Sequence, residues 1–310
     1  MTKAVVFAYH NVGYRCLSVL LAHGVDVGLL VTHEDSPTET IWFESVAALA
    51  ARHDIPVITP ADANDPAVVA RIAALRPDFL FSFYYRQMLK PAVLATASRG
   101  AYNMHGSLLP RYRGRVPVNW AVIHGETETG ATLHEMVEKP DAGAIVARQA
   151  VPILPNDTAF EVFQKVTVAA EMALHGVLPA LLAGTAPALP NDLAAGSYFG
   201  GRKPEDGRID WSRDAVAVHN LVRAVAPPYP GAFTTLDGRP LKVLGSLPAP
   251  HRNPRSTEPG LYVSDGLCFA DCGQGERIAV LRLFALEFEG APLDAARFTA
   301  LFGERKLPFN

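Results

Sequence analysis

The stretch AVVFAYHNVGYRCLSVLLAHG, residues 4–24, indicates the fold class of this 310-residue chain. Its first six residues are small, β-branched or aromatic, which is typical of a strand buried inside a parallel sheet. A turn is expected over residues 10–13. A helix is expected over residues 14–22, because the apolar spacing there is helical and stops at Gly24. A strand, a turn and a helix in this order begin a doubly wound α/β domain.

The same alternation continues through the first half of the chain. Continuous apolar runs predict further strands, and segments with helical spacing lie between them. The expected strands cover residues 25–32, 55–58, 78–83, 132–137 and 144–150, and the expected helices cover residues 43–53, 66–75 and 157–182. We therefore predict that residues 1–185 form an α/β domain with a doubly wound, mostly parallel, Rossmann-like sheet.

The sequence changes character after residue 182. Residues 186–208 are rich in Gly, Pro, Ala, Asn and Asp, and we interpret them as a linker that wraps over the protein, because Tyr198 and Phe199 need cover. A helix is expected over residues 215–224. Short strand candidates punctuated by Gly and Pro follow at 232–236, 241–247, 260–263, 267–270 and 278–288. We predict that residues 209–310 form a small, OB-like β-barrel domain.

Composition excludes several classes of protein. Apolar residues make up 49% of the chain and charged residues 19%, as in globular proteins, and a net charge of −3 does not favour nucleic acid or an acidic membrane surface as a partner. Three scattered cysteines do not make a disulfide framework, which fits a reducing cytoplasm. The apolar start is interpreted as a strand rather than a signal peptide. No uninterrupted apolar run of about 18 residues occurs, so no transmembrane helix is expected.

The ends of the expected strands are where a ligand should bind, because open α/β sheets bind ligands outside the carboxyl ends of their strands. The segments at those ends are residues 9–13, 83–89 and 103–107. The first of them offers only Gly13, whereas a dinucleotide-binding turn needs three glycines. A nicotinamide cofactor is therefore not expected.

The segment NMHGSLLPRYRG, residues 103–114, holds the densest set of reactive side chains. Asn103 and His105 are two residues apart, so on an extended segment they point to the same face. An amide can donate to a developing oxyanion, and an imidazole can move protons near neutral pH. Asp141 lies in the loop between the strands expected over 132–137 and 144–150, where it would orient the imidazole. A contact across 36 residues is a hypothesis.

These residues carry a resemblance. Asn103-x-His105-Gly-Ser-Leu-Leu-Pro, with Asp141 downstream, resembles the formyltetrahydrofolate-dependent formyltransferase family, which includes methionyl-tRNA, glycinamide ribonucleotide and sugar-nucleotide formyltransferases. Further segments are similar to the UDP-4-amino-4-deoxy-L-arabinose formyltransferases of lipid A modification, namely FAYH (7–10), SFYYR (82–86), PVNW (117–120), GETETG (125–130), DAGAIV (141–146), VRAV (222–225) and YPGAF (229–233). The similarity spans nearly the whole chain and is weakest after residue 248. The best-known members add an NAD-dependent decarboxylase unit, for which 310 residues leave no room.

The resemblance implies a reaction and a set of site residues. The formyl group of 10-formyltetrahydrofolate would pass to the 4-amino group of a nucleotide-linked sugar, with UDP-4-amino-4-deoxy-L-arabinose as the first candidate and polymyxin resistance as the setting. His105 would manage protons, Asn103 would stabilise the oxyanion, and Asp141 would raise the pKa of His105; no metal is needed. The implied folate contacts are Gln87, Met88, Leu89, Arg115, Val137, Glu138, Lys139 and Pro140, and the candidate sugar contacts are Tyr9, Arg111, Arg113, Asn119 and Trp120.

Other readings of the same residues stay open. A methionyl-tRNA formyltransferase would use the same three residues but should carry a basic second domain, whereas residues 205–310 contain 12 Lys and Arg against 13 Asp and Glu. A formyltetrahydrofolate hydrolase would use water in place of the amine, and a non-catalytic folate-binding module would tolerate loss of the three residues. His124 and His134 are interpreted as ordinary surface or strand residues, and Cys268 and Cys272 lack a second ligand pair for zinc.

Overall fold

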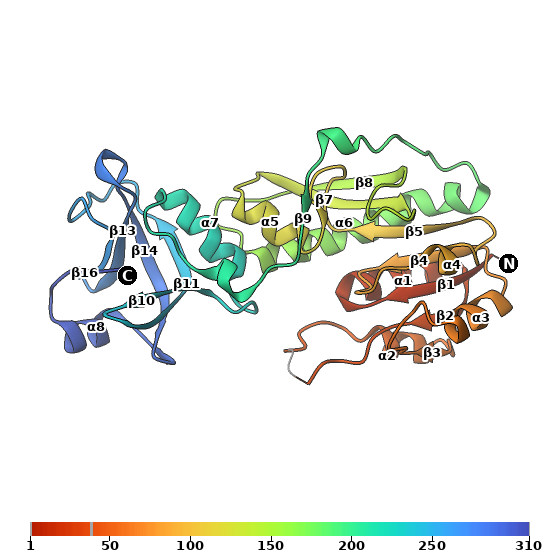
Figure 1. Ribbon diagram of the computed structural model, residues 1–310, viewed down its shortest axis with the longest axis horizontal. Helices are drawn as coiled ribbons and strands as arrows, with labels where there is room; N and C mark the ends of the chain where they lie inside the picture. The colour runs from red at the N-terminus through yellow and green to blue at the C-terminus, as the bar shows by residue number, and fades with distance from the viewer. Residues whose placement is uncertain (1, 38–39, 310) are drawn as a thin grey trace. The chain divides into compact units, whose positions relative to one another are not determined.

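The computed structural model describes residues 2–37 and 40–309 (Figure 1). Its internal contacts divide the chain into two compact units. The first unit runs to Pro117 and adds Glu128–Pro152 and Gln164–Gly200. The second unit consists of Val118–Thr127, Ile153–Phe163 and the residues from Gly201 onward. Each unit therefore combines segments that are far apart in the sequence.

The first unit is built on a seven-stranded sheet with the order β3-β2-β1-β4-β5-β7-β8. Five strands are parallel to their neighbours, and β7 and β8 add an antiparallel edge beside β5. The prediction of a mostly parallel α/β sheet is thus confirmed. The strands are β1 (Lys3–Ala8), β2 (Asp26–Val31), β3 (Val57–Ile58), β4 (Phe79–Phe83), β5 (Gly100–His105), β7 (Glu128–Glu135) and β8 (Ile145–Pro152).

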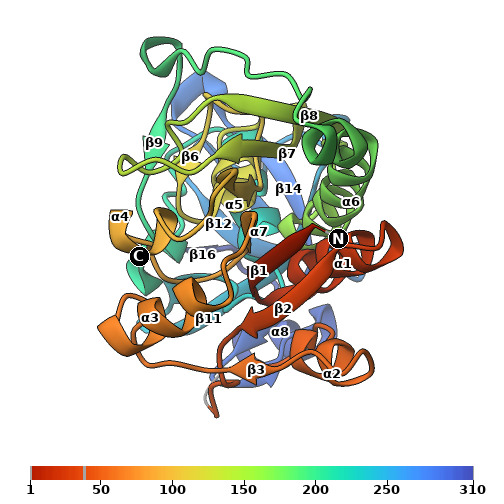
Figure 2. The ribbon, with the colours of Figure 1, turned by 90° about the vertical axis from the view of Figure 1, so that its right-hand side faces the viewer.

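Helices cover both faces of this sheet. Figure 2 shows α1 (His10–Ala22) and α6 (Ala159–Ala183) on one side and α3 (Pro66–Ala74) and α4 (Pro91–Leu94) on the other. The short helix α2 (Val46–Ala51) packs against α1. Apolar side chains of the central strands fill the space beneath α3 and α4 with a core that includes Val5, Phe7, Leu29, Val31, Ile72, Leu80 and Val93.

The turn expected over residues 10–13 is wrong, because α1 begins at His10, directly after the single residue Tyr9. The helix can start this early because Gly13 has no side chain. A Cβ atom at Gly13 would lie 3.1 Å from the Cβ of Ala8 and 3.3 Å from the carbonyl oxygen of Phe83. The first turn of α1 is therefore packed tightly against the ends of β1 and β4.

One helix in the described part of the chain, α6, is long and apolar enough to cross a membrane by length and composition alone. A search for uninterrupted apolar runs does not find this helix, because the polar residues Gln164, Lys165 and Glu171 lie within its sequence. Half of its most apolar stretch is buried inside the structure. A core helix passes the same test, and α6 is held to α1 by an ion pair between Arg15 and Glu171 at 2.9 Å.

The second unit is a curled antiparallel sheet with the order β10-β11-β14-β13-β12-β16. Its edges meet at one bridge between Leu236 and Phe309. The helix α7 (Ala215–Val225) packs on β11, and its first turn is capped by the Asp214 carboxylate, which accepts from the Ala217 N–H at 2.8 Å. An OB-like topology stays a prediction. The elements are α5 (Pro117–Ile123, in this unit from Val118), β10 (Ala232–Leu236), β11 (Arg239–Pro248), β12 (Gly260–Ser264), β13 (Leu267–Cys272), β14 (Ala279–Phe288), β15 (Ala291–Pro292), α8 (Ala295–Phe302) and β16 (Leu307–Pro308).

The region expected as a linker, residues 186–208, carries regular structure of its own. Its strand β9 (Tyr198–Phe199) pairs in parallel with β6 (Arg113–Gly114). The ring of Phe199 stacks on Tyr112 with centroids 5.3 Å apart, whereas Tyr198 is exposed. The expectation that both aromatic residues are covered is therefore right for Phe199 and wrong for Tyr198. Two short 3-10 helices, η1 (Leu193–Ala195) and η2 (Pro204–Gly207), complete this region.

Candidate active site

Strand β5 carries Asn103 and His105 at its carboxyl end. The two-residue spacing places them on one face of the strand, as the sequence predicts. β5 pairs in parallel with β4 and antiparallel with β7, so it lies where the sheet changes from parallel to antiparallel. His105 is buried and Asn103 is half-buried. Both side chains are thus held on a rigid strand.

The loop between β7 and β8 brings Asp141 to these residues. Its Oδ1 atom lies 3.6 Å from Nδ1 of His105, and its Oδ2 atom accepts a hydrogen bond of 2.9 Å from the Gly114 N–H. Asp141 itself has a left-handed backbone with φ of +50°. Two residues later the chain requires a glycine, Gly143, because a Cβ there would lie 2.1 Å from the carbonyl oxygen of Glu135. The separation of 36 residues between His105 and Asp141 is therefore closed by a tight return from β7.

A second histidine, His134, also belongs to this cluster. It lies on β7 directly opposite Asn103, and Asn103 Nδ2 is 3.1 Å from its Nε2 atom. The same Nε2 atom is 3.4 Å from Asp141 Oδ1, and His134 is only 2% exposed. Interpreting His134 as an ordinary surface or strand residue missed this placement. The signal that would find it is the antiparallel return of β7, which sets His134 beside Asn103.

The electrostatics of the cluster favour an ionised Asp141. Burial alone would raise the pKa of Asp141, but it is outweighed by the facing His105, by the close Nε2 of His134 and by the Gly114 N–H. These groups hold the pKa of Asp141 well below its usual range. The carboxylate is therefore a fixed negative charge between two imidazoles at neutral pH.

The other nitrogen of His105 is held by the backbone. Its Nε2 atom lies 2.8 Å from the carbonyl oxygen of Tyr112, so this nitrogen carries a hydrogen. Nδ1 faces the Asp141 carboxylate across 3.6 Å, which is longer than a hydrogen bond. Nδ1 is thus the ring nitrogen that the Tyr112 carbonyl does not engage.

Strained backbone collects around this cluster. Positive φ angles occur at Tyr84, Tyr112, Val116 and Asp141, and Val116 is a β-branched residue at φ +47°. Such conformations cost about 1–3 kcal/mol each and persist only where neighbouring structure enforces them. Gly106, directly after His105, lets the Tyr84 ring approach the backbone, since a Cβ there would lie 1.9 Å from the Tyr84 hydroxyl oxygen and would displace it.

The implied folate contacts fall into two groups. The side chains of Gln87 and Leu89 contact other residues of the protein. Gln87 accepts from the Ala63 N–H and donates to the Ala61 carbonyl, and Leu89 packs in the core. The other group is open to solvent: Met88 is 56% exposed and Val137 is 43% exposed. Arg115, Glu138 and Lys139 are also exposed, and Pro140 is half-buried.

The candidate sugar contacts are spread over both units. Tyr9 is buried and donates from its hydroxyl to Asp35 Oδ1 at 2.7 Å. Arg111 is exposed, whereas Arg113 is half-buried, and its Nε atom has no hydrogen-bond partner in the described part of the chain. In the second unit, the Asn119 amide is buried and donates to the Ala224 carbonyl at 2.8 Å. The remaining candidate, Trp120, borders a cavity of that unit.

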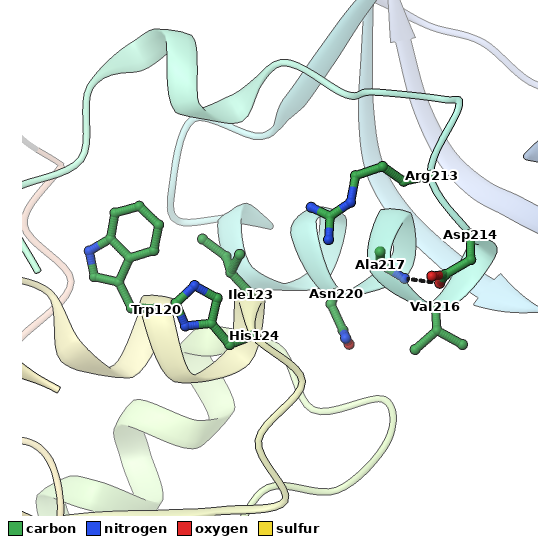
Figure 3. A pocket seen from close by; sticks show the side chains of 8 residues that line it. All are labelled: Trp120, Ile123, His124, Arg213, Asp214, Val216, Ala217 and Asn220. Atoms are coloured by element: carbon green, nitrogen blue, oxygen red, sulfur yellow. Dashed lines mark hydrogen bonds between the residues drawn. The ribbon is translucent and has the colours of Figure 1, made fainter. Parts of the chain in front are cut away.

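That cavity has a volume of about 560 Å³ and lies between α5 and α7 (Figure 3). Trp120 and His124 stack along one wall with ring centroids 5.8 Å apart, and Arg213 and Asp214 stand on the other. A smaller cavity of about 290 Å³ in the first unit is bordered by Tyr9 and by residues that follow β2. Over residues 2–37 and 40–309, no group of three or more His, Cys, Asp or Glu side chains could hold a metal ion.

Comparison with known families places the chain. Residues 20–178 match the formyl transferase family, and residues 202–300 match the formyl transferase C-terminal domain. The chain belongs to the formyl transferase family. In this formyl transferase, Asn103, His105, His134 and Asp141 all lie within the first matched region.

Solved structures share the fold of this formyl transferase. An N-formyltransferase from Helicobacter canadensis, solved with folinic acid and dTDP-3-aminofucose, superposes with a TM-score of 0.70 at 18% identity, covering 91% of this chain and 99% of that one. WlaRD, a sugar 3N-formyl transferase solved with dTDP and 5-N-formyl-THF, gives the same TM-score and identity over 91% and 97%. HypX from Aquifex aeolicus, in complex with tetrahydrofolic acid, gives 0.63 at 17% identity over 98% and 48%.

Proposed function

We propose that this enzyme transfers the formyl group of 10-formyltetrahydrofolate to the amino group of a nucleotide-linked sugar. The observation that carries the proposal is the cluster of Asn103, His105 and Asp141 on one strand end and one loop. The similar structures that were solved with a folate and a dTDP or dTDP-sugar ligand support this donor and this class of acceptor. The three cysteines are free and buried, which fits a cytoplasmic enzyme.

The proposed chemistry uses the geometry of β5. The amine nitrogen attacks the formyl carbon and forms a new C–N bond, while the carbonyl electron pair moves onto oxygen. The Asn103 amide donates a hydrogen bond to that oxyanion, which is typically worth about 10²–10³-fold in rate. The bond from the formyl carbon to the folate nitrogen then breaks, and the carbonyl reforms.

Protons must move during this sequence, because the amine loses one and the leaving folate nitrogen gains one. His105 Nε2 is engaged by the Tyr112 carbonyl, so we assign the transfer to Nδ1. The Asp141 carboxylate faces this atom at 3.6 Å and keeps the ring oriented. The chemistry needs no metal, because a formyl group on folate nitrogen is already an acyl donor.

The acceptor we propose first is UDP-4-amino-4-deoxy-L-arabinose, the substrate of the subfamily whose sequence motifs this chain resembles, in lipid A modification and polymyxin resistance. A diphosphate needs only one or two arginines, and Arg111 and Arg113 follow the catalytic strand. A tRNA acceptor would need an extended basic surface, whereas residues 205–310 contain 12 basic and 13 acidic residues.

A competition assay tests the proposal. The enzyme receives limiting 10-formyltetrahydrofolate together with UDP-4-amino-4-deoxy-L-arabinose, dTDP-linked 4-amino sugars and initiator methionyl-tRNA at physiological salt, and products are read by mass spectrometry. We expect a formylated sugar nucleotide in the wild type and in the control His53→Ala, which changes an exposed histidine at the end of α2, but not in His105→Ala. Preferential formylation of the tRNA, or release of formate without an acceptor, would overturn the substrate assignment.

A further inference from the structure

A strap of chain, which we define as residues 189–199, crosses both loops that surround His105. It follows α6 and belongs to the first unit. At its start, Leu189 and Ile145 exchange two backbone hydrogen bonds of 2.8 and 2.9 Å, which ties the strap to the beginning of β8. The strap is thus anchored directly after the loop that carries Asp141.

Asn191 fastens that loop. Its side-chain amide donates two hydrogen bonds of 3.0 Å, one to the carbonyl oxygen of Asp141 and one to that of Gly143. The first acceptor belongs to Asp141, the left-handed residue with φ of +50°, and the second lies two residues later. A turn held in this sparsely populated conformation needs such external bonds, because the local chain alone does not favour it.

The far end of the strap fastens the loop after β5. The Ser197 hydroxyl oxygen accepts from the Tyr112 N–H at 2.9 Å, and the Ser197 carbonyl accepts from the Arg113 N–H at 3.0 Å. The carbonyl oxygen of Phe199 then accepts a hydrogen bond of 2.9 Å from the Arg115 N–H. Directly before Ser197, Gly196 approaches the loop after β5 closely, since a Cβ there would lie 2.3 Å from the carbonyl oxygen of Pro110.

These two fastened loops hold His105 from opposite sides. The Tyr112 carbonyl, placed by Ser197, lies 2.8 Å from Nε2 of His105. The Asp141 carboxylate, placed by Asn191, lies 3.6 Å from Nδ1. We infer that Asn191 and Ser197 are positioning residues for formyl transfer, which fix the two groups that orient the His105 imidazole. This inference rests on the proposed function, because it assigns the reaction to His105.

This positioning role gives a reason for the ordered structure of residues 189–199, although their composition is typical of a linker. A misplacement of about 1 Å in a catalytic group can cost about 10²-fold in rate. Losing one of several fastening bonds should cost less, so we expect kcat to fall about 10-fold in Asn191→Ala and in Ser197→Ala. The KM values for folate and acceptor should change less than about twofold, since neither side chain is placed at a ligand.

The test compares these variants with two matched controls. Asp192→Ala removes an exposed strap residue whose carboxylate caps η1, and it should leave kcat unchanged. Ser197→Thr keeps a hydroxyl oxygen for the Tyr112 N–H and should restore most of the kcat that Ser197→Ala loses. In ¹⁵N-labelled full-length protein, the ring nitrogen signals of His105 should shift in Asn191→Ala and stay in place in Asp192→Ala.

The outcomes separate this inference from the proposed function. If the wild type formylates a sugar nucleotide while Asn191→Ala and Ser197→Ala keep wild-type kcat, the strap has no positioning role. If the wild type formylates no acceptor, the proposed function is wrong, and the ring signals decide alone: unchanged His105 signals in both variants overturn the inference. Should Asn191→Ala fail to fold, the Ser197→Ala and Ser197→Thr pair gives the same decision.

Discussion

Asp141 Oδ1 lies 3.6 Å from Nδ1 of His105, and both side chains are almost wholly shielded from solvent, with 13% and 7% of their surfaces exposed. At this distance the attraction is electrostatic rather than a hydrogen bond. Because little water reaches the pair, salt screens it weakly. Nδ1 is therefore oriented by the charge of Asp141 but makes no hydrogen bond with it. In the proposed mechanism, a proton on that atom would therefore pass to the substrate without breaking a hydrogen bond to Asp141.

The first prediction concerns the two side chains on β5. His105→Ala and Asn103→Ala should each lower kcat by about 10²–10⁴-fold, the usual loss for a general acid–base or an oxyanion donor. Folate affinity should change little, because both groups are proposed to act on the transition state. Stopped-flow detection of tetrahydrofolate release with a sugar-nucleotide acceptor measures kcat. Near-normal turnover in either variant would show that its side chain is not part of the chemistry.

A second prediction follows from the lowered pKa of Asp141. At pH values between the folded and unfolded pKa values of Asp141, the unfolded state binds more protons than the folded state. The ionised carboxylate therefore stabilises the fold at pH values above its unfolded pKa of 3.8, and this contribution to stability is lost as the pH falls toward the folded pKa. Asp141→Asn should therefore lower the free energy of unfolding by on the order of 2 kcal/mol at pH 7 and by less at pH 3. Urea unfolding at both pH values measures this.

The control for that experiment is Asp54→Asn, which changes an exposed aspartate after α2. Its effect should be small and equal at both pH values. An Asp141→Asn effect that is also equal at pH 3 and pH 7 would mean that the imidazoles do not stabilise the ionised carboxylate.

The third prediction concerns His134. Its Nδ1 lies 2.7 Å from the Glu135 carbonyl oxygen, and its Nε2 lies 3.1 Å from the nitrogen of the Asn103 amide and 3.4 Å from Asp141 Oδ1. His134→Ala frees that amide, and we expect kcat to fall about 10-fold with little change in KM. His134→Gln keeps a polar group beside Asn103 and should recover part of the loss. Equal kcat in wild type and His134→Ala would leave His134 with a packing role alone.

The sequence predicts the fold more fully than the site. Continuous apolar runs marked strands such as β1 and β4, because a strand buried on both faces admits few polar residues. The register of β7 on β5 depends on non-local hydrogen bonds, and this register alone sets His134 opposite Asn103. Composition likewise misrepresents the strap, since Gly196 is there for close approach to Pro110 rather than for flexibility.

A fourth prediction addresses backbone strain. Val116 has φ of +47° although it is β-branched, and its side chain is exposed, so little burial opposes a change. Asparagine tolerates this conformation better, and Val116→Asn should raise the free energy of unfolding by about 1 kcal/mol. Urea unfolding at neutral pH gives the value. A destabilised variant would mean that contacts of the valine side chain outweigh the strain of its backbone.

The last prediction concerns the folate donor. Met88 and Val137 are large apolar side chains that stay exposed in a protein whose apolar residues are otherwise mostly buried, and each lies in a segment assigned to folate by resemblance. When a ligand ring covers an exposed apolar side chain, the apolar surface removed from water contributes about 25 cal/mol per Å² to the free energy of binding. Met88→Ala and Val137→Ala should therefore raise the KM for 10-formyltetrahydrofolate about 5- to 20-fold and leave the acceptor KM and kcat nearly unchanged. Leu301→Ala is the control, because it removes an equally exposed apolar side chain from α8 in the second unit. A KM for folate that moves no more in the Met88 and Val137 variants than in the Leu301 variant would remove both residues from the donor site, while leaving the assignments of Asn103, His105 and Asp141 untouched.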